Sequence, residues 1–374
     1  MTERILTKDD LDDMLAGVGI LGTGGGGDPD TFGRPLVEWD IKKGREYRII
    51  DPKDVGDDAF VVCGGYAGSV KAFKSVQKMV EGWDTRFELL EAMRIMESIR
   101  NRKVDHVVPF ELGGANTPVI LSLAARAGIA TVDGDGLGRA APETQMSTFL
   151  GHGISLTPMP FVDLEGNVLV VNHAVKPTYP DEIMRAAIVL NGGSGANTHY
   201  PMSGKQLKES VIPNTISLSI EVGRAVREAL DAKRDPVEAF MRTVHGTEIF
   251  KGAIRTMRGE DRGAFYHVKA TVKGLDKFKG KTMEVVFKNE TMMAHVNKRL
   301  ASVFPDLLCM LDPKSGQGVM TANLRPGTKV AFVGIPAHER LRECLKTEIG
   351  QQAFGAARYG YPKIKYRPIE TLKP

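Results

Sequence analysis

Short apolar runs alternate with helix-like segments over residues 47–132. The runs AFVVC and HVVPF have the length and apolar content of buried strands. Between them, apolar residues recur at helical spacing with charged residues opposite, which is typical of helices that face a core. The expected strands are 47–50, 59–63, 106–110 and a short one ending at Val132, and the expected helices are 69–79, 87–100 and 117–127.

This alternation predicts an α/β domain with a mainly parallel sheet. The strands that end near residues 63, 110 and 132 are each followed by a polar, glycine-rich turn. Because parallel strands end at the same edge of a sheet, and open α/β sheets bind ligands there, we expect these three turns to share one rim.

The rest of the chain changes pattern. Thr7 is expected to cap a helix over 8–18, Asn214 and Asp235 to cap later helices, and residues 161–171 to form a hairpin. Beyond residue 246, short strands are separated by glycine and lysine turns. We therefore expect an N-terminal α/β domain at 1–172 and a C-terminal domain at 173–374, with helices over 178–245 and a β-rich part over 246–345.

The most concentrated candidate chemistry lies in residues 131–149, TVDGDGLGRAAPETQMSTF. Its ionisable residues are Asp133, Asp135, Arg139 and Glu143, and its glycines allow a tight turn. The turn follows a short strand, where a ligand site is expected. A solvated surface turn is the alternative, because Asp and Gly are ordinary turn residues.

A second glycine loop, GTGGGGDP, follows the first helix. Its glycines favour close approach of the backbone to a ligand or to another part of the protein. Its candidate binding residues are Thr23, Gly25, Gly26 and Asp28. No lysine follows as in a P-loop, and no strand precedes as in a dinucleotide fold, so no nucleotide is expected. The alternatives are a ligand or metal loop and a tight structural crossing.

The turn ELGGAN joins a strand to a helix N-terminus, where unpaired amides favour anions or dipoles. Glu111 and Asn116 frame this turn, although Asn116 could simply cap the helix. A later polar segment, 191–199, carries His199 and three glycines. We expect it to close over the site as a lid, with an interdomain linker as the alternative and a purely structural histidine as the alternative for His199.

Composition narrows the class of protein. Lys and Arg total 50 against 46 for Asp and Glu, without a basic tract, so a small-molecule substrate is expected rather than nucleic acid. Cys63, Cys309 and Cys344 form neither a disulfide framework nor a CxxC site, which fits the cytoplasm, and no apolar run is long enough for a membrane span. The spacing of the histidines does not indicate a zinc site. A divalent metal ion held by carboxylates is an alternative that the sequence leaves open.

Several motifs together resemble the S-methyl-thiohydantoin desulfurase family, long catalogued as a domain of unknown function. They are LGTGGGGDP, ELGGAN, VDGDGLGRAAPETQMSTF, IPNTISLSIEVGRAV, FKNE, VFPDLLCMLD, LRPGTKVAFVG and QQAFG, and they span nearly the whole chain. The resemblance implies an α/β domain followed by a β-rich domain. Members also occur beside hydantoinase and oxoprolinase subunits, which implies cyclic-amide chemistry. The turn VCGGY at 62–66 departs from the family's GAP-like pattern.

The resemblance implies an enzyme that directs water to a carbon of a five-membered amide or thioimidate ring. Such chemistry needs a base, an acid and groups that hold developing charge. Asp133 or Asp135 would be the base, Glu143 the acid or second carboxylate, and Arg139 the anion stabiliser, with Glu111 and Asn116 binding the ring. The alternative is a non-catalytic subunit that binds the ring or a hydantoinase-like partner. A homo-oligomer is also compatible with the sequence.

Overall fold

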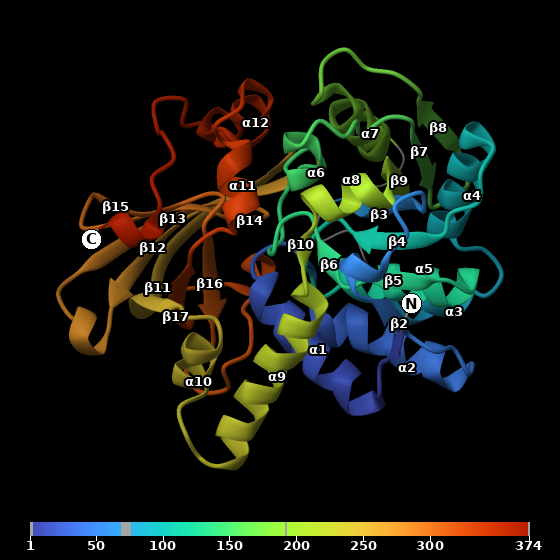
Figure 1. Cartoon of the computed structure of the whole chain (residues 1–374). Coiled ribbons are helices and arrows are strands. Elements are labelled where there is room, and N and C mark those ends of the chain that lie inside the picture. The colour runs from blue at the N-terminus through green and yellow to red at the C-terminus, as the bar shows by residue number, and fades with distance from the viewer. Residues whose placement is uncertain (1–2, 69–75, 191–192, 373–374) are drawn as a thin grey trace.

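The computed structural model describes residues 3–68, 76–190 and 193–372, which form two main sheets with helices packed around them (Figure 1). Within this described part, the first sheet has eight strands in the order β1-β2-β5-β4-β3-β9-β7-β8. Neighbours from β2 through β5 and β4 to β3 are parallel, as predicted. The strands are β1 (Arg4–Ile5), β2 (Arg48–Ile50), β3 (Phe60–Gly68), β4 (His106–Pro109), β5 (Ala130–Val132), β7 (Met159–Asp163), β8 (Val168–Val171) and β9 (Ser194–Ser203).

Local sequence rules explain most of the helices around this sheet. Thr7 begins α1 with a capping box, in which its hydroxyl accepts from the Asp10 amide and the Asp10 carboxylate accepts from the Thr7 amide. Gly128 ends α5 in the left-handed conformation. Part of the helix expected at 69–79 lies outside the described residues, which resume at α3. The helices are α1 (Lys8–Leu21), α2 (Arg34–Lys42), α3 (Val76–Gly82), α4 (Glu88–Arg100) and α5 (Asn116–Ala127).

The segment predicted as a lid is instead part of this sheet, so that prediction was wrong for the described residues 194–199. Strand β9 lies between β3 and β7 and pairs antiparallel with both. Small residues permit this position, since an added Cβ at Gly195 would lie 2.3 Å from the Phe161 ring. Residues 191–192 lie outside the described part. The first sheet therefore includes a strand, β9, that lies after the expected domain boundary at residue 172.

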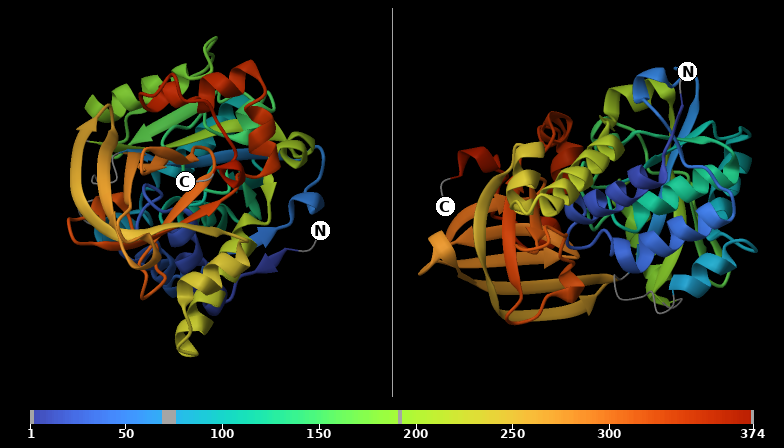
Figure 2. Two further views of the ribbon diagram at one scale, coloured as in Figure 1. Left: turned by 90° about the vertical axis from the view of Figure 1, so that its left-hand side faces the viewer. Right: turned by 90° about the horizontal axis from the view of Figure 1, so that it is seen from below.

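The second sheet belongs to the C-terminal half and is antiparallel. Among the described residues it has seven strands in the order β15-β14-β13-β12-β11-β17-β16. Figure 2 shows that these strands curl into a half-barrel, which matches the expected β-rich part. They are β11 (Thr247–Arg262), β12 (Phe265–Gly274), β13 (Thr282–Lys288), β14 (Glu290–Val296), β15 (Arg299–Val303), β16 (Leu307–Leu311) and β17 (Lys329–Ile335).

Further helices surround the two sheets. Asp235 caps α10 as predicted, because its carboxylate accepts from the amides of Val237 and Glu238. The helices are α6 (Thr148–Gly151), α7 (Tyr179–Leu190), α8 (Gly204–Ser210), α9 (Thr215–Asp231), α10 (Pro236–Thr243), α11 (Glu339–Cys344) and α12 (Glu348–Phe354). In the described part of the chain, no helix is both long and apolar enough to cross a membrane.

Two close contacts join the halves of the chain. Helices α1 and α9 cross at two glycines. A Cβ added at Gly17 would lie 1.8 Å from the Ser219 carbonyl oxygen, and a Cβ added at Gly223 would lie 1.8 Å from the Asp13 carbonyl oxygen. A short ribbon pairs β6 (Gly134–Asp135) with β10 (Ile212–Pro213). The loop that follows β5 within residues 131–149, called the acidic loop below, is therefore fixed against the C-terminal half.

Candidate functional site

A small cavity of about 70 Å³ lies where strands β3 and β4 end, at the rim that the sequence predicts for a site. Both halves of the chain line it. The acidic loop contributes Ala141, Pro142 and Thr144 to its lining, and the glycine loop contributes Gly25. The residues with polar side chains that line it are Tyr66, Glu111, Asn116, Thr144, Arg185, Asn197, His199, Asn289 and Glu290.

Glu111 follows β4 and is held at both carboxylate oxygens. Oε1 accepts from the Asn116 side chain at 2.9 Å, and Oε2 accepts from the Ala141 amide at 2.7 Å. Burial raises the pKa of Glu111 to about 7, against these hydrogen bonds and the charges of Arg185 and Arg139, which lower it. Glu111 therefore exchanges a proton near neutral pH.

Glu290 is the first residue of β14 and reaches the same cavity from the second sheet. Its side chain is buried, and within the described residues its Oε2 has no hydrogen-bond partner. A Cβ at Gly25 would lie 1.9 Å from Oε1, so the glycine makes room for the carboxyl group. Burial, with the nearby charge of Glu111, raises the pKa of Glu290 well above its ordinary value. Burial and the neighbouring Glu111 carboxylate therefore both favour the protonated form of Glu290.

His199, in β9, contributes a neutral imidazole. Its Nδ1 lies 2.6 Å from the Asn197 Oδ1, and the Asn197 Nδ2 donates to the Gly65 carbonyl at 3.4 Å, which assigns the amide orientation. Nδ1 is therefore the donor, and Nε2 carries the free lone pair. Nε2 has no hydrogen-bond partner in the part of the chain that is described, and burial lowers the pKa of His199 to about 3.

Asp133 binds the start of α9. Its carboxylate accepts from the amides of Ile216 and Ser217 at 3.0 and 3.1 Å and from the Ser217 hydroxyl at 2.5 Å. Asn214, the expected cap, is left-handed at this position and makes no side-chain capping bond. Asp133, which is distant in sequence, therefore caps the N-terminus of α9 in place of a local N-cap residue.

Asp135 is fully buried and does not line the cavity. Its carboxylate accepts from the Gly138 amide at 2.8 Å, and burial raises its pKa to about 8, with a further contribution from the charge of Glu111. The folded protein therefore keeps a proton on Asp135 in a pH range where the unfolded chain, with a carboxyl pKa of about 3.8, has lost it.

We expect Asp135→Asn to change the pH dependence of stability. Because the folded-state pKa is raised, stability from this group is present at acidic pH and is lost as the pH rises toward about 8. Asn cannot ionise, so the variant should gain stability over the parent as pH increases across this range. Denaturant unfolding at several pH values measures the effect, with exposed Asp58→Asn as the control. Parallel pH curves for parent and Asp135→Asn would contradict the expectation.

Arg139 and Glu143 join the acidic loop to the C-terminal half. Arg139 donates to the carbonyl oxygens of Asp306 at 2.7 Å and Thr291 at 2.8 Å. Glu143 accepts from the Lys288 ammonium at 2.6 Å and forms an ion pair with the Arg358 guanidinium. Neither Arg139 nor Glu143 lines the cavity. Carbonyl oxygens hold the Arg139 guanidinium and two cations hold the Glu143 carboxylate, so both side chains serve contacts with the C-terminal half.

Family models match both halves of the chain. One, described as the S-Me-THD-like N-terminal domain, matches residues 9–173, and the S-Me-THD-like C-terminal domain matches residues 176–369. The chain belongs to the S-Me-THD-like family.

Among solved structures, an X-ray crystal structure of a protein from Chromobacterium violaceum is similar to this S-Me-THD-like chain. The TM-score is 0.76 at 23% sequence identity, with 99% of this chain and 100% of that chain covered. At this identity the likeness supports the fold alone. A search of curated proteins finds no match.

The glycine loop of this S-Me-THD-like protein is a tight crossing. A Cβ at Gly26 would lie 2.8 Å from the Gly113 Cα, so the two glycine turns pack directly together. Thr23 accepts from the Met310 amide, and Asp28 accepts from the amides of Asp30 and Thr31. Of the binding residues predicted in this loop, only Gly25 lines the cavity.

The cavity is also lined by Glu290 and Asn197, which the sequence indicated only as polar residues at a strand end and in the segment 191–199, and by Arg185, which was not a sequence candidate. Glu290, Arg185 and Asn197 are distant from the acidic loop in sequence, and only the fold brings them to it. The FKNE motif was the one local sign of Glu290. Within the described residues, no group of three or more His, Cys, Asp or Glu side chains is arranged to hold a metal ion.

Proposed function

We propose that the protein is an enzyme that adds water to a carbon of a five-membered cyclic amide or thioimidate, as in S-methyl-thiohydantoin desulfuration. Membership of the S-Me-THD-like family supports this class of substrate. The observation that carries the proposal is the pair Glu111 and Glu290. These two buried carboxyl groups come from different parts of the fold to one cavity, and burial raises the pKa of each.

The two carboxyl groups divide the proton transfers. Ionised Glu111 takes a proton from water as its oxygen bonds to the ring carbon that carries the methylthio group. Glu290 gives its proton to the sulfur as the carbon–sulfur bond breaks. The electron pair of the carbon–nitrogen double bond shifts to the ring nitrogen when water adds, and that nitrogen receives the second proton of the water. The ring therefore keeps the water oxygen as a carbonyl beside an N–H, methanethiol leaves, and solvent restores the proton states of Glu111 and Glu290.

The surrounding groups orient the ring. The free Nε2 of His199 accepts a hydrogen bond from a ring N–H, since Asn197 holds the tautomer. Asn116 fixes Glu111, and the positive charge of Arg185 lies at the same cavity. In this proposal Asp133, Asp135, Arg139 and Glu143 support the loop rather than contact the substrate.

The direct test incubates the purified chain with an S-methyl-thiohydantoin. We expect methanethiol and the corresponding hydantoin to appear in equal amounts. Ring binding without any thiol release would refute the catalytic proposal.

The pH profile provides a second test. Because burial raises the pKa of Glu111 to about 7, and the base must be ionised, we expect kcat/KM to rise with pH through this value. A fall should follow at higher pH as Glu290 loses its proton. A flat profile from weakly acid to neutral pH would exclude Glu111 as the base.

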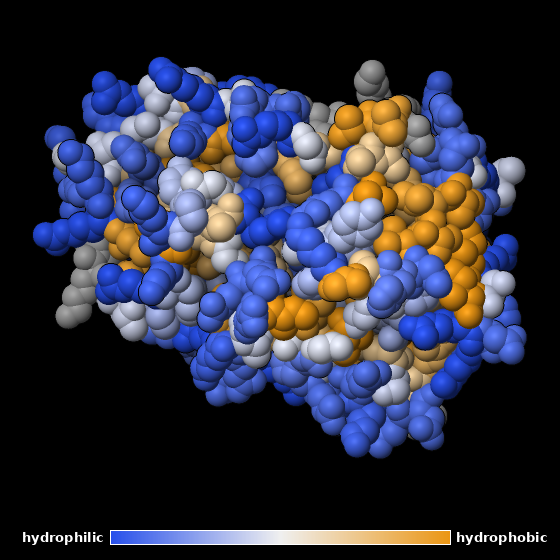
Figure 3. Space-filling view, turned by 90° about the horizontal axis from the view of Figure 1, so that it is seen from above, coloured by the Kyte–Doolittle hydropathy of each residue, from blue (hydrophilic) through white to orange (hydrophobic). Residues whose placement is uncertain are grey.

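A second candidate function is that of a subunit that needs a hydantoinase-like partner. Exposed apolar side chains favour it, because they gather between residues 164 and 190, with Val175 and Leu190 93% and 83% exposed. Figure 3 shows an apolar area on the side where α4, α7, β7 and β8 lie in Figure 1. The exposed residues are Leu164, Val168, Val170, Val175, Tyr179, Val189 and Leu190.

The two candidates differ in what the isolated chain can do. A subunit would bind the ring but release thiol only with its partner, and Leu190→Lys would weaken that association. Light scattering of the parent and of Leu190→Lys also tests a homo-oligomer through the same surface. Full turnover by the isolated chain would exclude the accessory role.

A further inference from the structure

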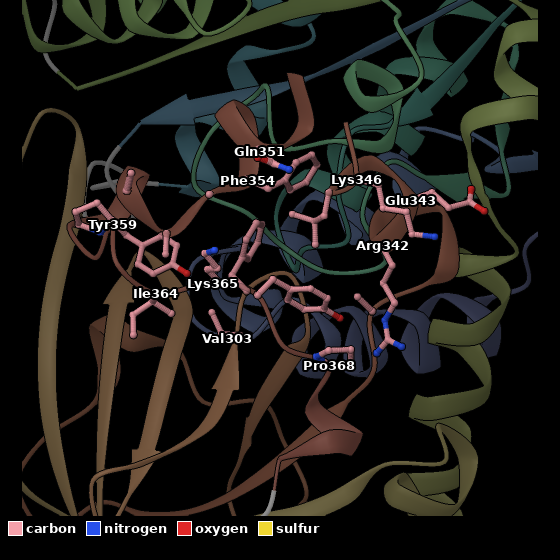
Figure 4. Close-up of a pocket in the computed structure, with 18 of the residues that line it drawn as sticks. Val303, Arg342, Glu343, Lys346, Gln351, Phe354, Tyr359, Ile364, Lys365 and Pro368 are labelled. Carbon is pink, nitrogen blue, oxygen red and sulfur yellow. The ribbon is translucent and has the colours of Figure 1, made fainter. Parts of the chain in front are cut away.

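A second, larger cavity of about 990 Å³ lies in the C-terminal half. It is bounded by the end of β15, by α11 and α12, and by the segment that follows α12 (Figure 4). None of the residues that line it lines the cavity of Glu111 and Glu290. Its volume is within the range of small-molecule sites.

The wall of this cavity is largely apolar. The half-buried Leu345 and Ile364 contribute aliphatic surface. Phe304 and Phe354 also line it, and their rings stack with centroids 6.0 Å apart and planes inclined by 22°. These rings are 2% and 1% exposed, so they form the buried base of an apolar wall whose accessible surface comes mainly from Leu345 and Ile364, and such a wall suits an apolar ligand body.

One buried hydroxyl group in the cavity is available to form a hydrogen bond with a ligand. Tyr359 is only 7% exposed, and its hydroxyl has no hydrogen-bond partner among residues 3–68, 76–190 and 193–372. Figure 4 shows this side chain extending into the cavity. The other tyrosine there, Tyr366, already donates to Asp306 at 2.9 Å. An unpaired buried hydroxyl is costly, so Tyr359 favours a ligand with a hydrogen-bond acceptor.

Free positive charge is also present. Arg342 forms ion pairs with Asp306 and Glu370, whereas Lys346 and Lys365 form none with the described residues. The acidic residues at the rim are Glu339 and Glu343 of α11, both exposed, and Figure 4 shows the Glu343 carboxylate directed away from the cavity. Of these two lysines, Lys365 lies on the segment after α12 that also contains Tyr359, so we assign it to a ligand's acidic group.

We infer that this cavity binds a small aromatic carboxylate at a site separate from the proposed ring-hydrolysing centre. The aromatic body lies against the apolar wall that Leu345, Ile364 and the two phenylalanine rings form. The carboxylate accepts hydrogen bonds from the Tyr359 hydroxyl and the Lys365 ammonium.

Calorimetric titration of the full chain with phenylacetate tests this inference. We expect saturable binding to one site, with phenylacetamide, which lacks the charge, at least about tenfold weaker, because charged hydrogen bonds are worth about 1.5–3 kcal/mol. Saturating hydantoin should leave the phenylacetate isotherm unchanged, since the cavities are separate. Absence of saturable binding, or loss of binding with hydantoin, would overturn the inference.

Variants locate the site. Lys365→Gln and Tyr359→Phe should each weaken phenylacetate about tenfold, and Ile364→Asp should abolish binding. Lys363→Gln is the matched control, because Lys363 is an exposed neighbouring lysine that does not line the cavity. An equal effect of Lys363→Gln and Lys365→Gln would show only nonspecific attraction and would refute the site.

Discussion

Glu290→Gln is expected to slow thiol release from an S-methyl-thiohydantoin by about 10²–10⁴-fold, the usual contribution of a positioned general acid. The variant keeps the shape of the side chain but replaces its acidic proton by an amide. Burial holds the proton on Glu290, and its Oε2 has no partner in the described structure, so the group is free to act on a ligand. Steady-state assay of methanethiol measures the loss.

The matched control is Glu284→Gln, at an exposed position on β13 in the same sheet. We expect it to retain full activity. Circular dichroism and thermal unfolding should show that Glu290→Gln is folded, since a neutral amide replaces a neutral acid. Parent-like turnover by folded Glu290→Gln would remove Glu290 from the mechanism and leave the ring cavity without its proposed acid.

Glu143→Gln is expected to lower the free energy of unfolding by about 3–5 kcal/mol, the cost of removing one partner from a buried ion pair. The Glu143 and Lys288 side chains are 1% and 6% exposed, and Lys288 lies 2.6 Å from the carboxylate. The variant leaves the Lys288 ammonium without its anion and leaves the Arg358 guanidinium with its longer ion pair to Glu182, at 3.4 Å. Chemical denaturation measures the change.

Glu238→Gln provides the comparison, because Glu238 pairs with Arg242 on the exposed surface of α10. Exposed pairs contribute about 0–1 kcal/mol, so little change is expected. The double variant Glu143→Gln, Lys288→Met should recover part of the lost stability by removing the unpaired ammonium. If Glu143→Gln unfolds like the parent yet loses turnover, Glu143 is catalytic rather than structural.

These two glutamates show why residue type alone could not assign roles. Both stand in recognisable motifs, ETQMS and FKNE. The acidic loop directs Glu143 toward Lys288 and Arg358, outside the cavity lining, whereas Glu290 at the start of β14 lines the cavity. The direction of each side chain depends on contacts with residues far away in sequence.

The sequence by itself determined the features that rest on local physics. Apolar periodicity placed the parallel strands and their common rim, the capping residues Thr7 and Asp235 began their helices, and the hairpin β7–β8 followed from its turn. Each depends on backbone conformation and hydrogen bonds within a few residues, so short stretches of sequence contain the necessary information. The position of Glu111 at the cavity could be predicted in the same way, because its turn follows a strand that the apolar pattern identified.

Only the tertiary structure decided which distant groups meet. Strand β9 is too poor in apolar residues to be recognised, and it is a strand because β3 and β7 pair with its backbone and its small residues fit between them. Asp133 became the cap of α9, and Glu290 joined Glu111, through contacts between the two halves of the chain. Such contacts depend on packing and burial, which also set the pKa values that separate the proposed base from the proposed acid.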